Sequence, residues 1–145
     1  MHGQLAVGAV CCLVNIAIHA AIMAWVVRAA RRAAHVTKSL PGARRLTAIM
    51  IASVFVLLVA HALEVLVWAL TYRLVDLVPV GDGFYFAFVN YTTLGYGDMR
   101  PAPEWRMLGP ITALNGILLF GWSTAVIFEI LRTSAGALRD LPTHS

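Results

Sequence analysis

Charge is scarce in this sequence of 145 residues. Only 12% of the residues are Asp, Glu, Lys or Arg, whereas 60% are hydrophobic, and the mean hydropathy is +0.79. Ordinary soluble domains carry about 25% charged residues. The composition therefore argues against a soluble globular domain and favours an all-α membrane protein.

Cysteine is also rare, since the sequence contains only Cys11 and Cys12. The two residues are adjacent, so a disulfide between them would be badly strained, and the CxxC spacing of a metal site is absent. We interpret them as two small apolar residues. No disulfide framework is expected.

What the sequence does contain is three long apolar runs. Leu5–Val27 has no formal charge, Leu46–Leu70 has only Glu64, and Ile111–Leu131 has only Glu129. At about 1.5 Å per helical residue, each run exceeds the roughly 30 Å hydrocarbon core of a bilayer. We expect three spanning helices that occupy nearly the whole chain, which leaves no room for a separate soluble catalytic or ligand-binding domain.

The first run has no Lys or Arg before it and is longer than a typical signal core, so we expect a mature helix within residues 1–27. It carries no arginine repeat, so a voltage sensor of the usual kind is not expected. His19 stands alone in it, and we predict that this residue packs at an interface.

Basic residues gather between the first and second runs. Six of the eleven lie there, and they set a predicted cytoplasmic loop over residues 28–45: Arg28, Arg31, Arg32, Lys38, Arg44 and Arg45. The N-terminus is then outside, and the short tail at 132–145 is cytoplasmic. No DNA-binding motif accompanies the net charge of +4, so we expect contact of the basic cluster with anionic lipid and not with nucleic acid.

Between the second and third runs lies an apolar and aromatic segment that is too short to cross a membrane. Residues 83–92 supply roughly 15 Å of helix, half of a bilayer. Asp82 is a plausible N-cap, so we predict a re-entrant helix at 82–92 that enters from the outer side. The residues after it must return inside protein, because unpaired backbone groups in hydrocarbon cost several kcal/mol each.

The return segment contains TTLGYGD, residues 92–98. A file of carbonyls that face one axis needs an alternating backbone, and Gly95 and Gly97 can take positive φ without steric penalty. Four such segments around an axis could replace the water shell of a cation with carbonyl dipoles.

Residues 93–98, TLGYGD, resemble the signature filter of tetrameric potassium channels, in which Val is common at the position of Leu94. The resemblance covers residues 46–131 and implies an outer helix at 46–70, a pore helix at 82–92, a filter at 93–98 and an inner helix at 110–131. It implies a homotetramer that conducts K⁺ passively across a cell membrane, the inner membrane of a bacterium, with no cofactor and no enzymatic activity. The implied K⁺ sites are formed by the carbonyls of Thr93, Leu94, Gly95 and Tyr96 and by the Thr93 hydroxyl. Gly97 then completes the outward turn, and Asp98 lies at the outer mouth.

Several residues are predicted to support the filter. The resemblance implies that Tyr96 points away from the axis and packs behind the filter, where family members often have Trp and Glu. The residues available for this support on the pore helix are Tyr85, Phe86, Val89 and Thr92. His61 and Glu64, one turn apart in the second run, could replace the missing acid at Val89 and make conduction sensitive to pH, in which case Glu64→Gln abolishes the sensitivity. A buried structural contact is the alternative.

The third run begins after Pro110 and is interrupted by glycines. The resemblance places Gly116 as a hinge of the inner helix, while Gly121 fits a hinge or close helix packing. Ile117, Phe120, Thr124 and Phe128 follow helical spacing and could line the cavity, with Phe128 as a gate that closes by dewetting; ordinary packing is the alternative. Glu129 either attracts cations at the cytoplasmic mouth or pairs with Arg132.

Three other functions fit less of the sequence. A weakly selective cation channel is favoured by Leu94 but not by the retained Tyr96. A membrane enzyme or metal site could use His19, His61 and Glu64, although no HExxH spacing is present and TTLGYGD would have no purpose. A non-conducting accessory subunit would not need an intact filter.

Overall fold

The chain is described by a computed structural model that covers residues 2–36, 42–79 and 81–139. Its elements are α1 (His2–Val36), α2 (Gly42–Leu74), α3 (Gly83–Tyr91), the short 3-10 helix η1 (Pro103–Trp105) and α4 (Leu108–Arg139). No strand occurs among the described residues. Three segments are long and apolar enough to cross a membrane: His2–Ala33, Gly42–Leu74 and Pro103–Gly136. The prediction of an all-α membrane protein is confirmed.

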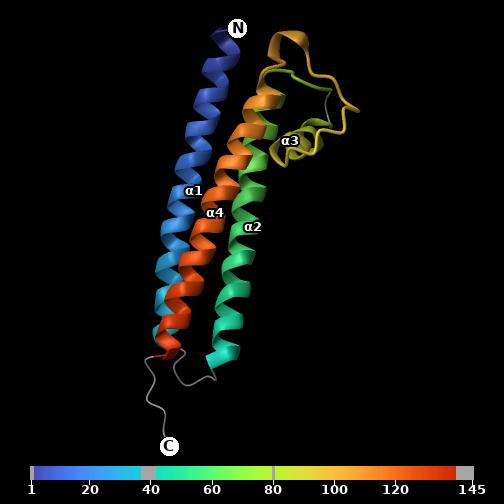
Figure 1. Cartoon of the computed structure of the whole chain (residues 1–145). Helices are drawn as coiled ribbons and strands as arrows, with labels where there is room; N and C mark the ends of the chain where they lie inside the picture. Colours follow the sequence, from blue (N-terminus) through green and yellow to red (C-terminus); the bar gives the residue numbers. More distant parts are fainter. Residues whose placement is uncertain (1, 37–41, 80, 140–145) are drawn as a thin grey trace, which may run out of the picture.

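The three long helices run side by side, and α3 lies beside one end of the bundle (Figure 1). Helix α1 packs against both α2 and α4, whereas α3 packs against α2 and α4. The N-terminus lies at the same end of the bundle as α3, and the C-terminal end of α4 lies at the opposite end (Figure 1). In chain order, α3 lies between α2 and α4, the two long helices that follow α1.

The long helices extend beyond the predicted bounds. Residues 28–36 continue α1 and residues 42–45 begin α2, so most of the predicted loop at 28–45 is helical; its remainder, 37–41, lies outside the described residues. Residues 132–139 of the predicted tail likewise continue α4. Hydropathy marks only the part of a helix that fits the hydrocarbon core, whereas Ala and Arg sustain the helix into the polar region.

Two buried clusters hold the bundle together. The larger one lies near α3 and consists of Cys11, Val65, Trp68, Tyr72, Leu77, Phe86, Ala87, Tyr91 and Leu108. The smaller one lies toward the other end and consists of Val26, Ala30, Ile49 and Ile130. Cys11 and Cys12 are both free thiols, and Cys11 fills the larger cluster as a small apolar side chain, as predicted.

Large apolar side chains also cover the outside of the bundle. Leu13, Ile51 and Phe55 are each 65% exposed, and Leu58 is 63% exposed. A soluble protein rarely leaves so many apolar side chains in water. This surface suits lipid or other copies of a membrane protein.

Candidate ion-conduction site

Helix α3 is built from one short apolar run whose inner face is buried. Phe86, Ala87, Val89 and Tyr91 are buried, and the Phe86 ring lies 5.7 Å from the Tyr72 ring of α2. The prediction that Asp82 caps this helix is wrong for its side chain, which makes no capping hydrogen bond. Only its carbonyl takes part, by accepting a hydrogen bond from Phe86 N at 2.9 Å.

The chain reverses at the C-terminal end of α3. Thr93 N donates to Asn90 O at 2.9 Å, and Leu94 N donates to Val89 O at 3.0 Å. The Thr92 hydroxyl donates to Phe88 O at 2.8 Å. These bonds satisfy the last carbonyls of α3 and fix the direction in which residues 93–98 leave the helix.

The backbone after α3 alternates in conformation. Thr93, Gly95 and Gly97 have positive φ, at 60°, 56° and 73°, while Leu94 and Tyr96 between them do not. The predicted positive φ at the two glycines is confirmed, but the one at Thr93 was not foreseen. A β-branched residue in this region is a true outlier that costs about 1–3 kcal/mol, and such strain gathers at functional sites.

Residues 93–98 are exposed along the single chain, apart from the contacts described above. The Tyr96 side chain is 67% exposed and Leu94 is 53% exposed. The predicted packing of Tyr96 behind the filter is therefore not made within one chain.

One side-chain bond ties the end of this segment back to α3. The Tyr85 hydroxyl donates to Asp98 Oδ2 at 2.8 Å. This bond to the carboxylate raises the pKa of the Tyr85 phenol above its ordinary value, because it favours the protonated form. Both residues were identified in the sequence, but their pairing was not. The bond thus connects α3 to Asp98, the last residue of the segment 93–98.

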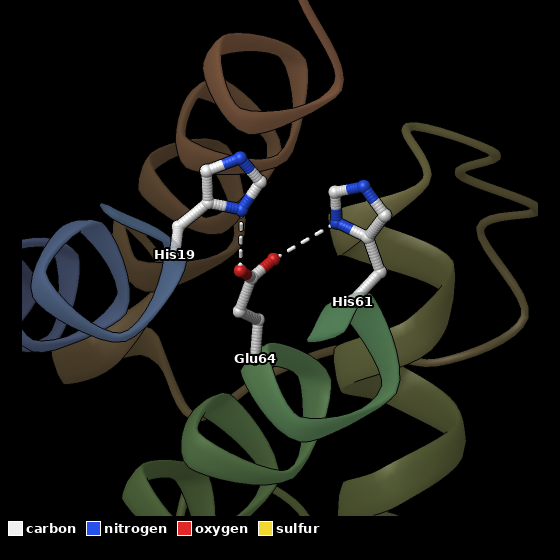
Figure 2. A group of neighbouring side chains, drawn as sticks. All are labelled: His19, His61 and Glu64. Carbon is white, nitrogen blue, oxygen red and sulfur yellow. Dashed lines mark hydrogen bonds and ion pairs between the residues drawn. The ribbon is translucent and has the colours of Figure 1, made fainter. Parts of the chain in front are cut away.

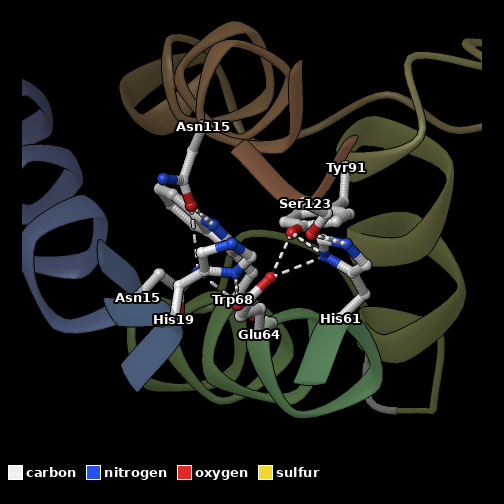
Figure 3. A network of polar contacts seen from close by, with 8 residues as sticks. All are labelled: Asn15, His19, His61, Glu64, Trp68, Tyr91, Asn115 and Ser123. Carbon is white, nitrogen blue, oxygen red and sulfur yellow. Dashed lines mark hydrogen bonds and ion pairs between the residues drawn. The ribbon is translucent and has the colours of Figure 1, made fainter. Parts of the chain in front are cut away.

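A buried polar network lies beneath α3 and includes both residues singled out in α2. Glu64 is fully buried, and its carboxylate accepts a hydrogen bond from the Tyr91 hydroxyl at the end of α3. His61 Nδ1 lies 2.9 Å from both Glu64 Oε2 and the Tyr91 hydroxyl, and His61 Nε2 lies 3.0 Å from Ser123 Oγ of α4. Figure 3 shows these side chains converging from three helices. The suggested contact of His61 and Glu64 with the pore helix is present; its effect on the pH dependence of conduction stays a prediction.

His19 was expected to pack at an interface, and it also makes a polar contact that was not predicted. It is fully buried, and its Nδ1 lies 2.8 Å from Glu64 Oε1. Its ring also lies 5.2 Å from the Trp122 ring of α4. The sequence signal was available, because a polar ring inside an apolar spanning helix normally faces a polar partner. Its partner lies 45 residues away, which a local pattern cannot show.

A second part of the network was missed altogether. Asn15 Nδ2 donates to Asn115 Oδ1 at 3.0 Å and to Glu64 O at 3.3 Å. Trp68 Nε1 donates to the same Asn115 oxygen at 3.0 Å. Asn15 lies one turn before His19, so α1 presents two polar side chains on one face to the rest of the bundle (Figure 3).

Gly116 has a packing role that its predicted hinge role did not include. A Cβ atom added there would lie 2.0 Å from Tyr91 O and 3.0 Å from Tyr91 C. Helix α4 therefore touches the backbone at the end of α3, and only glycine permits this distance. Gly121 makes no comparable contact within the chain, since an added Cβ would meet nothing within 4 Å.

The predicted cavity stripe is exposed along α4 but is not uniform. Ile117 is 56% exposed, Phe128 is 67% exposed, and Thr124 is also exposed. Phe120 is 37% exposed because its ring lies 4.6 Å from the His61 ring and 5.3 Å from the Tyr91 ring. Phe120 thus covers the network, whereas the other three remain available to line a cavity or to contact another chain.

At the far end of α4, Glu129 makes the predicted ion pair. Its Oε2 lies 2.9 Å from Arg132 Nη2, and its Oε1 accepts a hydrogen bond from Thr133 Oγ1 at 3.1 Å and lies 3.9 Å from Arg31 of α1. Of the two interpretations, the pair with Arg132 is therefore observed. Arg31 adds a contact between α1 and the end of α4.

A half-length helix, a strained and exposed return segment and two flanking spanning helices define a membrane protein that forms an ion pore. A family model described as an ion channel matches residues 60–133. The chain belongs to this ion channel family, and part of it is similar to potassium channels. It is a channel protein and not an enzyme.

Two groups of relatives are similar to part of the chain. Over 49 residues it is 41% identical to the potassium voltage-gated channel subfamily A member 10 of Homo sapiens, which covers 33% of this chain and 10% of the relative. Over 71 residues it is 39% identical to the voltage-gated potassium channel KCNC4 of Rattus norvegicus, which covers 46% of this chain and 11% of the relative. The chain thus spans about a tenth of the length of these relatives. No solved structure matches it.

Proposed function

We propose that four copies of this chain form a K⁺-selective pore. The carbonyls of residues 93–96 and the Thr93 hydroxyl hold dehydrated K⁺, Gly97 completes the turn outward, and Asp98 attracts cations at the outer mouth. Potassium is the permeant ion, and no cofactor takes part. The C-terminal end of α3, with the partial negative charge of a helix terminus, faces ions that enter from the cavity.

The observation that carries this proposal is the alternation of positive φ at Thr93, Gly95 and Gly97. It falls on the one segment that reads TLGYG and follows a helix of half-membrane length. Carbonyl dipoles that line a narrow path can replace the hydration shell of K⁺. The local strain at Thr93 supports a segment shaped for binding and not for its own stability.

The tetramer follows from the same segment. One chain supplies one filter segment, and one segment cannot enclose an axis, so a closed ring of identical chains is required. The exposed apolar side chains of α2 and α4 are available for such contacts. In that ring, Tyr96 packs behind the filter against a neighbouring chain.

The test is cation flux in reconstituted vesicles. Purified protein is placed in liposomes loaded with K⁺, with Na⁺ outside, and flux down the K⁺ gradient is recorded. Gly95→Asp adds a carboxylate and a side chain where φ is 56°, so we expect it to abolish flux. Gly3→Asp adds the same group where an added Cβ would meet nothing within 4 Å, and we expect it to conduct like the unmodified protein.

Each outcome decides between the candidate functions. Flux that is driven by K⁺ and lost only in Gly95→Asp supports the selective filter. Equal K⁺ and Na⁺ flux would replace it with a weakly selective cation channel. No flux from a protein that sizes as a tetramer would indicate a closed channel, whereas no flux and no tetramer would favour an accessory subunit.

We also propose that the end of the bundle with the filter faces outward. Arg28, Arg31 and Arg32 at the end of α1 and Arg44 at the start of α2 lie at the end opposite α3 (Figure 1), as basic cytoplasmic residues should. These four are exposed and can reach anionic lipid. The predicted lipid contact of Arg45 is wrong, because this residue is only 2% exposed. Lys38 lies outside the described residues.

The orientation is tested with single cysteines in a protein whose two native cysteines are replaced by alanine. In vesicles of known orientation, an impermeant thiol reagent should label His2→Cys but not Gly136→Cys from the outer side.

A further inference from the structure

The polar network contains a compact group of three metal-ligating side chains. One ligand atom each from His19, His61 and Glu64 lie within 4.8 Å of one another. Figure 2 shows the two imidazole rings facing the Glu64 carboxylate from two sides, each with its Nδ1 toward one carboxylate oxygen. The two nitrogen–oxygen distances are 2.8 and 2.9 Å. The donors therefore already converge on one small volume.

The carboxylate in this group is an ionisable group in an environment where charge is costly. Glu64 is fully buried, within a segment apolar enough to span a membrane. In the described part of the chain, its ion-pair partners are the two imidazoles and include no Lys or Arg. A buried carboxylate is strongly disfavoured unless it is paired or bound to a metal. A bound cation would compensate the carboxylate directly, in addition to the hydrogen bonds that it already accepts.

The donor types select the kind of ion. Two imidazole nitrogens and one carboxylate oxygen are the ligands that Zn²⁺ prefers, and three protein ligands with an open fourth position are common in its sites. Mg²⁺ and Ca²⁺ prefer oxygen ligands and would bind poorly. His61 and Glu64, three residues apart on α2, form a natural chelating pair, and His19 adds the third ligand from α1.

The second shell fits at His61. His61 Nε2 lies 3.0 Å from Ser123 Oγ, which can fix the ring with its Nδ1 toward the ion. His19 Nε2 is buried without a hydrogen-bond partner in the described structure, so the polar contact of this ring is made by the Nδ1 that faces the carboxylate. The Tyr91 hydroxyl lies 2.9 Å from His61 Nδ1 and can supply or orient the fourth ligand.

We propose that His19, His61 and Glu64 form a binding site for a divalent transition metal, with Zn²⁺ as the best match. The site joins α1 to α2 behind the end of the pore helix. A bound ion coordinates the Glu64 carboxylate, which then no longer accepts the hydrogen bond of the Tyr91 hydroxyl. Because Tyr91 directly precedes Thr92, this change occurs next to the filter. On the basis of the proposed function, metal binding then alters K⁺ conduction.

Binding is tested without any measurement of conduction. The full chain is purified in detergent, stripped with a chelator and titrated with Co²⁺, which reports tetrahedral nitrogen and oxygen ligands by intense visible absorption. We expect saturation at one Co²⁺ per chain and displacement by Zn²⁺. His19→Asn and Glu64→Gln each remove one ligand, and we expect each to weaken binding by at least about tenfold.

His2→Gln is the matched control, because His2 is an exposed histidine on the same helix as His19. It should bind Co²⁺ like the unmodified protein. Uptake that is equal in His19→Asn, Glu64→Gln and the control would overturn the proposal. So would a failure of the unmodified protein to saturate, or a spectrum typical of octahedral Co²⁺, and neither result depends on whether a variant folds.

A second arm examines the consequence for the channel. Micromolar Zn²⁺ should change K⁺ flux in vesicles of the unmodified protein and leave flux in Glu64→Gln unchanged. Binding without any change in flux would reject the connection to the filter while keeping the site. A protein that binds Co²⁺ but never conducts would contradict the proposed function and leave the metal site standing.

Discussion

Gly116→Ala is the sharpest test of how α4 supports the filter. The added Cβ would lie 2.0 Å from Tyr91 O, whereas ordinary contact begins at 3.4 Å, so α3 and α4 must separate locally by 3.4 minus 2.0, or 1.4 Å. The obstacle is backbone, which cannot rotate away as a flexible side chain can. Tyr91 directly precedes Thr92 and the filter, so the displacement falls on the residues that are proposed to bind K⁺.

The expected effect on stability is small, while the effect on conduction is large. Overpacking costs about 1–3 kcal/mol, but alanine gains about 1 kcal/mol over glycine inside a helix. We therefore expect the tetramer to form and to unfold at a slightly lower temperature. K⁺ flux in liposomes should nevertheless fall to near background, because catalytic or binding geometry tolerates shifts of this size poorly.

Gly136→Ala is the matched control on the same helix. It gains the same helix propensity, and its Cβ would meet nothing within 4 Å, so we expect normal flux and equal or slightly greater thermal stability. If Gly116→Ala conducts and unfolds like Gly136→Ala, the close approach of α4 to Tyr91 is wrong. In that case Gly116 would be better explained by the hinge role alone.

Two further changes test the two ends of the pore. Tyr85→Phe removes the hydroxyl that donates to Asp98 at 2.8 Å, so we expect K⁺ current to decay faster during sustained conduction. Phe84→Leu changes a residue on the same helix that does not make this bond, and it should leave the decay unchanged. Equal decay in the unmodified protein and both variants would exclude a role for the bond. Phe128→Ala removes a ring that is 67% exposed on α4, and we expect a higher open probability in single-channel records, with Leu131→Ala as the control. An unchanged record for Phe128→Ala would mean that the constriction lies elsewhere.

The parts of this fold that could be predicted from sequence are those set by the bilayer and by local backbone chemistry. The thickness of the hydrocarbon core fixes how long an apolar run must be, so the three spanning helices and the short α3 were recognisable. Positive φ at Gly95 and Gly97 was predictable because glycine alone takes it without cost. The ends of the long helices could not be predicted, because a residue such as Arg28 or Arg132 ends the apolar run but does not end the helix.

Contacts between distant residues account for what could not be predicted. His19 and Glu64 are 45 positions apart and Asn15 and Asn115 are 100 apart, and no local periodicity links them. The contact of Gly116 with Tyr91 has the same origin, since the distance between two backbones depends on how helices cross. The positive φ of Thr93 arises from the reversal after α3 and not from any preference of threonine.

These long-range contacts also bear on whether α1 belongs to the same structural unit as the other helices. The family match begins at residue 60 and so excludes α1, which could suggest a separate attachment to a complete pore unit. Without α1, however, the carboxylate of Glu64 would lose its bond to His19, and Asn115 Oδ1 would lose its bond to Asn15. Glu64 would keep His61 and Tyr91 as partners, and Asn115 Oδ1 would keep Trp68, but both groups would lose the cover of α1 and lie closer to hydrocarbon, where polar groups are costly. Residues inside the matched region are thus bonded to a helix that lies outside it, and α1 packs in one bundle with α2 and α4, the two helices that contact the pore helix.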